Sequence, residues 1–150
     1  SLDRRQRQMC IRDRYSRMSI RHFCKSFFTE IVKEMAKADI IISRAGASSV
    51  AEVAAIGRAA VFIPFPESLD DHQVYNARSL TNEKAAILLP QKEVEEDPTV
   101  LAKHILSLIE DPKKCQKMAE RARKLAHKNA LNDIIASVKS CQKLRSGRVK

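Results

Sequence analysis

Three short, largely apolar runs divide the middle of the chain. They cover residues 39–43, 59–65 and 85–89, and each is followed by residues typical of turns or loops. Runs that are apolar throughout, rather than at every second position, are typical of strands buried on both faces of a parallel sheet. We therefore predict three parallel strands, of which the last ends at Pro90.

Apolar residues at helical spacing predict helices between these runs. They cover residues 27–38 and 72–82, and a further helix follows the first strand and ends near Ile56, with Gly57 as its C-cap. After Pro90 we expect an acidic linker over 91–97 and then three helices, over 100–109, 113–128 and 132–143. The Asp111-Pro112 pair is a start signal for the second of these. Strands alternating with helices predict an α/β fold with a doubly wound parallel sheet, followed by C-terminal helices.

The basic residues are concentrated at the two ends of the chain. The net charge is +10, but residues 27–138 are nearly neutral. A nucleic-acid-binding face is expected to be built into the fold, so we predict no nucleic-acid partner, while contacts of the tails with acidic lipid head groups stay open. Residues 1–26 have neither a helical stripe nor strand alternation, and we interpret them as a basic leader that is disordered or not native. A domain over 27–143 and a basic tail over 144–150 follow.

The composition gives no sign of a metal site or of a membrane span. The four cysteines (Cys10, Cys24, Cys115, Cys141) form no Cys-x-x-Cys pair, and no two histidines have ligand spacing. No apolar run approaches the roughly 18 residues of a membrane-spanning helix. We expect no metal and no cofactor, and a reducing cytosol suits these thiols better than a disulfide framework does.

Two loops follow predicted strands and therefore lie where parallel sheets bind ligands. In the first, residues 43–49, small residues around Gly46 would let a ligand approach the backbone, and the first amides of the next helix suit an anion. The alternative is an ordinary turn in which Ser48 or Ser49 only caps the helix. The second loop, 64–73, holds five polar side chains suited to a polyhydroxyl ligand, or else Asp70 or Asp71 merely caps the following helix.

Together the two loops carry a resemblance to a known family. Residues 43–52, 64–66 and 70–77 resemble the C-terminal domain of the bacterial peptidoglycan N-acetylglucosaminyltransferases of glycosyltransferase family 28, and the match runs over about 27–139. Members of this family transfer N-acetylglucosamine from its UDP form to lipid I, which makes lipid II. The resemblance implies the C-terminal half of a GT-B architecture, with a partial Rossmann-like parallel sheet, and an inverting, metal-independent displacement.

The resemblance also implies which residues bind UDP-N-acetylglucosamine. Gly46, Ala47, Ser48 and Ser49 would bring backbone amides to the diphosphate, and Glu52 would accept hydrogen bonds from the ribose. His72 and Gln73 occupy the positions for the donor sugar. Arg44 either contacts a phosphate or braces the turn, and Asn76 is expected to be structural.

The family's N-terminal domain is absent from this sequence, and the catalytic residue stays unknown. We expect a fragment that is inactive alone, with a lipid-linked acceptor bound through the missing domain, on the cytoplasmic side of a membrane surface. Asp70 or Asp71 is either a catalytic base or a helix cap. Three alternatives stay open: the stand-alone subunit of a two-subunit N-acetylglucosaminyltransferase, another UDP-sugar transferase, or a non-catalytic module that acts through its basic tails.

Overall fold

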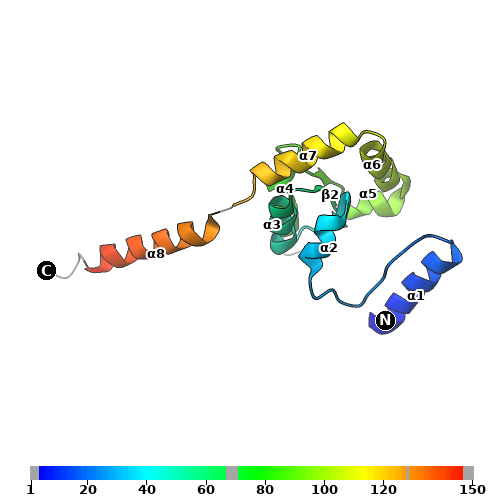
Figure 1. Ribbon diagram of the computed structural model, residues 1–150, viewed down its shortest axis with the longest axis horizontal. Coiled ribbons are helices and arrows are strands. Elements are labelled where there is room, and N and C mark those ends of the chain that lie inside the picture. Colours follow the sequence, from blue (N-terminus) through cyan, green and yellow to red (C-terminus); the bar gives the residue numbers. More distant parts are fainter. Residues whose placement is uncertain (1–3, 67–70, 128, 147–150) are drawn as a thin grey trace. The chain divides into compact units, whose positions relative to one another are not determined.

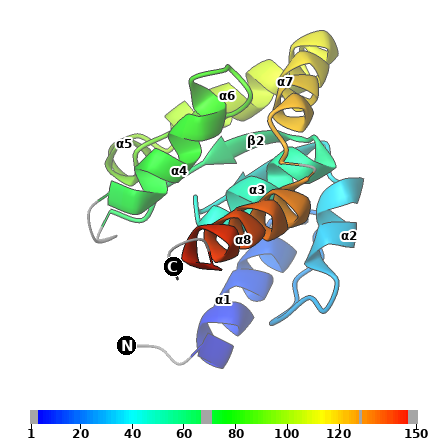
Figure 2. The same ribbon diagram turned by 90° about the vertical axis from the view of Figure 1, so that its left-hand side faces the viewer.

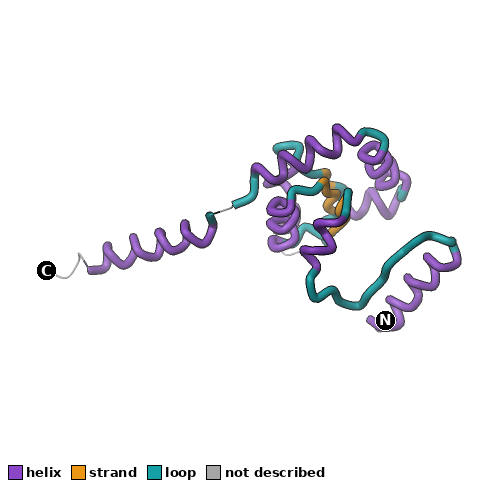
Figure 3. The backbone as a smooth tube through the Cα atoms, in the orientation of Figure 1, coloured by secondary structure: helices purple, strands orange, loops and turns teal. Residues whose placement is uncertain are grey.

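The computed structural model describes residues 4–66, 71–127 and 129–146. This part of the chain contains one sheet of three parallel strands in the order β1-β2-β3, where β1 is Ile40–Ser43, β2 is Ala59–Phe62 and β3 is Ile87–Leu88. Ser43 of β1 lies opposite Phe62 of β2, which lies opposite Leu88 of β3. Helices surround the strands (Figure 3), and the predicted α/β class with parallel pairing is confirmed.

Eight helices accompany the strands within the described residues. They are α1 (Arg4–Arg17), α2 (Ile31–Lys37), α3 (Ala47–Ile56), α4 (His72–Thr81), α5 (Gln91–Glu96), α6 (Thr99–Ile109), α7 (Pro112–Lys124) and α8 (Ala130–Ser146). The prediction of a linker over 91–97 was wrong, because most of this segment forms α5. Strand β3 is shorter than the apolar run that predicted it, because Ala85 and Ala86 are buried but do not belong to a strand. The apolar run therefore indicated which residues are buried and overestimated the length of the strand.

Apolar side chains fill a core on each face of the sheet. On one face, Ile41 and Phe62 pack in a cluster that includes Val53 of α3. On the other, Val61 packs in a cluster with Leu108 of α6 and Met118 of α7. Two perpendicular views agree that α3 lies on one side of β2 and that α6 and α7 lie on the other (Figures 1 and 2). Helices on both faces explain why the strands are apolar throughout.

Two helix ends follow the signals in the sequence. Gly57 closes α3 in the left-handed region, with φ of 68°, and its N–H donates to the Val53 carbonyl at 2.9 Å. Asp111 is the N-cap of α7, where its carboxylate accepts a hydrogen bond from the Lys114 N–H at 3.0 Å, and Pro112 is the first helical residue. Both predictions are confirmed.

The chain divides into two compact units, Ser1–Glu34 and Met35–Lys150. In the first unit the side chains of residues 10–27 are all exposed. Helix α1 has no apolar face, so no helical pattern of apolar residues marks it in the sequence. The boundaries expected at residues 26 and 143 stay predictions.

Candidate functional site

The carboxyl ends of the three strands lie side by side at one edge of the sheet. The backbone ladder continues past the strands themselves, since the Ile63 N–H donates to the Ser43 carbonyl and the Leu89 N–H to the Phe62 carbonyl, each at 2.9 Å. The loops that follow the strands therefore start next to one another, as the sequence predicted for the two candidate loops.

Helix α3 begins at this edge with an N-terminus that no side chain caps. Gly46 is its N-cap residue and makes no side-chain cap bond, and the first helical hydrogen bond runs from the Val50 N–H to the Gly46 carbonyl at 3.0 Å. Within the described part of the chain, the amides of Ala47, Ser48 and Ser49 have no acceptor. The alternative that a serine caps this helix was wrong, because both serines lie inside its first turn.

Glycine at position 46 is not required by the fold. Its φ of −64° and ψ of 149° are accessible to any L-residue. A Cβ built there would meet only the Ser49 Oγ, at a distance of 4.0 Å. The absence of a side chain thus leaves open space directly beside the three uncapped amides.

Glu52 lies one turn beyond Ser48 on α3. Residues four apart on a helix share a face, so its carboxylate is on the same side as the first turn. Glu52 is half-buried, and no described residue pairs with its carboxylate through an ion pair or hydrogen bond. A carboxylate in this position has both oxygens available to accept hydrogen bonds from a ligand.

Gln73 joins the second loop to the first residues of α4. Its Oε1 accepts a hydrogen bond from the Phe65 N–H at 2.9 Å, and its Nε2 group is the remaining donor of the side chain. His72 is exposed at the first position of α4, and Asp71 is the N-cap residue, with φ of 54° and no side-chain cap bond. Glu67 and Asp70, two of the five polar residues that the sequence places in this loop, lie outside the described residues.

Arg44 connects the ends of all three strands. Its Nη1 donates to the carbonyls of Ile63 and Pro64, both at 3.1 Å, and to the Oε1 of Gln91 at 2.6 Å. The guanidinium also lies 5.6 Å from the centre of the Phe65 ring, in cation–π geometry. Of the two roles left open for Arg44, bracing is therefore the one that these contacts support.

Two residues that the sequence did not assign to the site help to hold it. Asn76 of α4 donates from Nδ2 to the Ala45 carbonyl at 3.1 Å and so ties α4 to the first turn. Gln91 of α5 accepts from Arg44 and donates to Glu95. Gln91 comes just after the third apolar run, so the rule that ligand loops follow parallel strands would have drawn attention to it.

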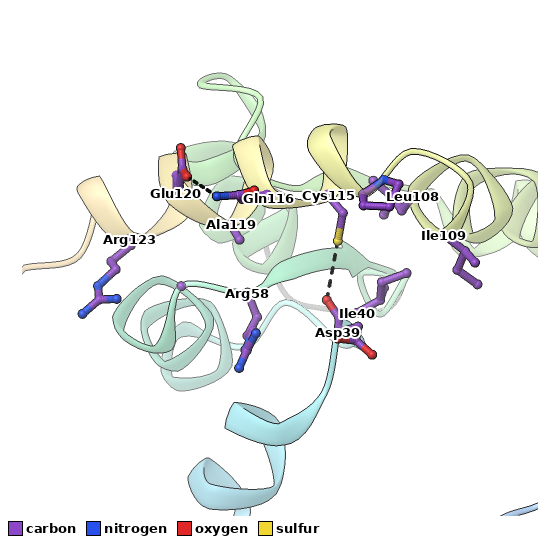
Figure 4. Close-up of a pocket in the computed structure, with 12 residues that line it drawn as sticks. Asp39, Ile40, Arg58, Leu108, Ile109, Cys115, Gln116, Ala119, Glu120 and Arg123 are labelled. Carbon is purple, nitrogen blue, oxygen red and sulfur yellow. Dashed lines mark hydrogen bonds between the residues drawn. The ribbon is translucent and has the colours of Figure 1, made fainter.

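A separate cavity of about 530 Å³ lies at the opposite, amino-terminal edge of the sheet. Figure 4 shows its side chains, which come from the start of β1, the turn after α3, the end of α6, and α7. Cys115 Sγ contacts the Asp39 carbonyl at 3.7 Å, and burial together with the nearby Asp39 carboxylate raises the pKa of this thiol. Cys115 is therefore a neutral thiol near pH 7 and a poor nucleophile. None of the predicted site residues lines this cavity.

The described residues lack two kinds of feature. No group of three or more His, Cys, Asp or Glu side chains among them is arranged to hold a metal ion. In the same part of the chain, no helix combines the length and the apolar character needed to cross a bilayer.

Comparisons with known proteins agree with this arrangement. A family model described as the glycosyltransferase family 28 C-terminal domain matches residues 4–141. A curated relative from Tolumonas auensis, named UDP-N-acetylglucosamine--N-acetylmuramyl-(pentapeptide) pyrophosphoryl-undecaprenol N-acetylglucosamine transferase, is 45% identical over 116 residues, which are 75% of this chain and 32% of the relative. A relative of the same name from Rickettsia akari is 39% identical over 134 residues, covering 87% of this chain and 34% of the relative.

A solved structure shows the same likeness in three dimensions. The crystal structure of Acinetobacter baumannii MurG superposes with a TM-score of 0.69 at 37% identity, over 76% of this chain and 32% of that one. The predicted class, a GT-B C-terminal half, is confirmed by this match. The chain spans about a third of the length of the relatives it matches. By the match over residues 4–141, the chain belongs to glycosyltransferase family 28 and corresponds to its C-terminal domain.

Proposed function

We propose that this chain is the donor-binding part of an enzyme that transfers N-acetylglucosamine from UDP-N-acetylglucosamine to lipid I, forming lipid II in peptidoglycan synthesis. The observation that carries the proposal is the uncapped N-terminus of α3, which opens at the carboxyl edge of the sheet beside the bare backbone of Gly46. The names of the relatives, which specify this donor and a lipid-linked muramyl acceptor, support the choice of substrates.

The diphosphate is assigned to the first turn of α3. A helix N-terminus carries the equivalent of about half a positive charge, and it presents free N–H groups to an anion. The amides of Ala47, Ser48 and Ser49 are the donors available here, and Gly46 lets the phosphate oxygens approach them. Glu52, on the same face one turn later, would accept hydrogen bonds from the two ribose hydroxyls.

The sugar is assigned to the start of α4. Because Gln73 Oε1 already accepts from the Phe65 N–H, this side chain would contribute its Nε2 group, donating to a sugar oxygen. His72, at the first position of the same helix, would line the sugar as well. Arg44 acts as a positioning residue, since its hydrogen bonds to the Ile63 and Pro64 carbonyls hold the second loop against the first.

The reaction proposed for the whole enzyme is an inverting displacement. A hydroxyl of the muramoyl acceptor attacks the anomeric carbon, the bond to the diphosphate breaks, and UDP leaves with the electron pair. The N-terminus of α3 stabilises the negative charge that grows on the leaving diphosphate. The acceptor site and the base that removes the hydroxyl proton are assigned to the part of the relatives that this chain does not span. We also propose that the enzyme works at the inner face of the cell membrane, where a lipid-linked acceptor would be held at the membrane surface.

The role of Glu52 provides a test of this proposal. Glu52→Ala is expected to weaken binding of UDP and of free uridine alike, by roughly tenfold or more, because hydrogen bonds to a charged group contribute about 1.5–3 kcal/mol. Ligand-detected NMR titration of the purified chain measures both affinities. Glu110→Ala, which removes an exposed carboxylate at the end of α6, serves as the control and should change neither. Unchanged affinity of folded Glu52→Ala for both ligands would exclude the ribose contact.

A further inference from the structure

A depression lined by charged side chains lies at the amino-terminal edge of the sheet, opposite the proposed donor site. It has a volume of about 440 Å³, and we call it the α7 basic pocket. Its polar lining comes from α7 with its N-cap residue and from the turn between α4 and β3, and it consists of Lys84, Asp111, Lys113, Lys114, Lys117 and Arg121. Lys84 precedes the amino end of β3, whereas the donor site follows the carboxyl ends of the strands.

The charge of this pocket is strongly one-sided. Five cationic side chains face one carboxylate, a net charge of +4, and no described carboxylate forms an ion pair with any of the five. The Asp111 carboxylate is itself engaged as the N-cap of α7. Lys113, Lys117 and Arg121 repeat every four residues, so they lie on one face of the helix, where like charges repel. A bound anion would relieve this repulsion.

Lys84 reaches the pocket from a turn with an unusual backbone conformation. Lys84 has φ of 53°, a left-handed conformation that follows many helix ends and that is usually taken by glycine. The turn is held by hydrogen bonds from the Lys84 N–H to the Thr81 carbonyl and from the Ala85 N–H to the Leu80 carbonyl. A lysine at this position adds strain that glycine would avoid, and it brings a fifth positive charge to the pocket.

The floor of the pocket is a buried core residue, and none of the described lining residues is aromatic. Met118, the remaining lining residue, is 7% exposed and packs in the hydrophobic core on the α6 and α7 side of the sheet. Lys114 is held by a hydrogen bond from its Nζ to the Ser107 Oγ at 3.1 Å, which joins α7 to α6. Because no aromatic side chain lines the pocket, it offers no stacking platform for a nucleobase or a sugar face.

We propose that the α7 basic pocket binds a multiply charged phosphate group. Lysine ammonium groups are compact point charges that suit phosphate oxygens, and the pocket has room for a diphosphate or for the head group of an anionic phospholipid. The two sources share this chemistry, and the experiment separates them. The site is distinct from the proposed donor site and goes beyond the proposed function.

The test uses the full chain and two probes. Inorganic pyrophosphate is titrated while backbone amide signals are followed, and co-sedimentation compares vesicles of phosphatidylcholine with vesicles that also contain phosphatidylglycerol. Lys113→Gln/Lys117→Gln removes two pocket charges, and Lys103→Gln/Lys139→Gln removes two exposed charges from α6 and α8 as a matched control. Lys113 and Lys117 are exposed, so the fold should tolerate their replacement.

The expected result is saturable binding that shifts the amides of Lys84 and of the first half of α7. The Lys113→Gln/Lys117→Gln variant should bind the probe roughly tenfold more weakly, and the Lys103→Gln/Lys139→Gln control should retain the affinity of the unaltered chain. Binding of pyrophosphate identifies a free phosphate compound as the ligand class, and binding only to anionic vesicles identifies a lipid head group. Equal losses in the two variants, or binding of neither probe, would overturn the proposal. The amides of residues 46–52 are followed in the same titration, so a failure of the proposed donor site can be told apart from a failure of the α7 basic pocket.

Discussion

Replacing Gly46 with alanine is expected to weaken UDP binding by at least about tenfold and to leave the melting temperature nearly unchanged. The backbone angles of Gly46 are accessible to alanine, and the added methyl group would meet only the Ser49 Oγ, at 4.0 Å. The fold therefore has room for this group. A diphosphate bound to the amides of Ala47 and Ser48 would clash with the methyl group, because that group would occupy the space through which the diphosphate approaches.

Calorimetric titration measures the affinity for UDP, and thermal unfolding of the same samples measures the melting temperature. Ala55→Ser is a suitable control, since Ala55 is exposed on α3 well beyond the first turn. A folded Gly46→Ala variant that binds UDP as well as the unaltered chain would show that no ligand approaches this end of the helix.

Gly57→Ala should have the opposite effects: it should lower the free energy of unfolding by about 2–3 kcal/mol and leave the affinity for UDP unchanged. The left-handed φ of 68° costs an L-residue roughly 1–2 kcal/mol. In addition, the new Cβ would lie 2.9 Å from the Cβ of Arg123, so α3 and α7 would have to move apart. Because a loss of 1 kcal/mol lowers the melting temperature of a domain of 150 residues by about 2–4 °C, circular dichroism should detect a fall of about 5 °C or more.

A second substitution measures how much of that loss comes from the outer atoms of the Arg123 side chain. Arg123→Ala removes the contacts of the Arg123 Cγ and Cδ but keeps the Cβ at 2.9 Å, so the double variant should recover stability only in part. Gly57 closes the far end of α3, and the folded fraction of Gly57→Ala should still bind UDP. A melting temperature equal to that of the unaltered chain would contradict the close packing of α3 against α7.

The parts of the fold that local sequence determines were predictable. The three apolar runs identified the strands, because burial on both faces leaves no polar position. Gly57 and the Asp111-Pro112 pair marked helix ends, since each acts through its own backbone or the next few residues. The order of strands and loops was also enough to bring two separate segments to one edge of the sheet.

The parts that depend on contacts distant in sequence were not predictable. Helix α5 has only six residues and an acidic composition, and its first residue, Gln91, is bound by Arg44, which follows β1 and is 47 positions away in the sequence. The same contact decides between the two roles of Arg44, which the sequence alone left open. Likewise, the choice of Gly46 over a serine as the N-cap depends on which carbonyl accepts the first helical bond.

A titration of the chain with UDP, and then with UDP-N-acetylglucosamine, shows whether the first turn of α3 and the start of α4 form a nucleotide-sugar site. We expect UDP to shift the backbone amides of residues 46–52, and the sugar nucleotide to shift the side-chain amide of Gln73 as well. If millimolar UDP leaves the amides of residues 46–52 unmoved in a sample whose dispersed spectrum shows that it is folded, UDP does not bind at the N-terminus of α3.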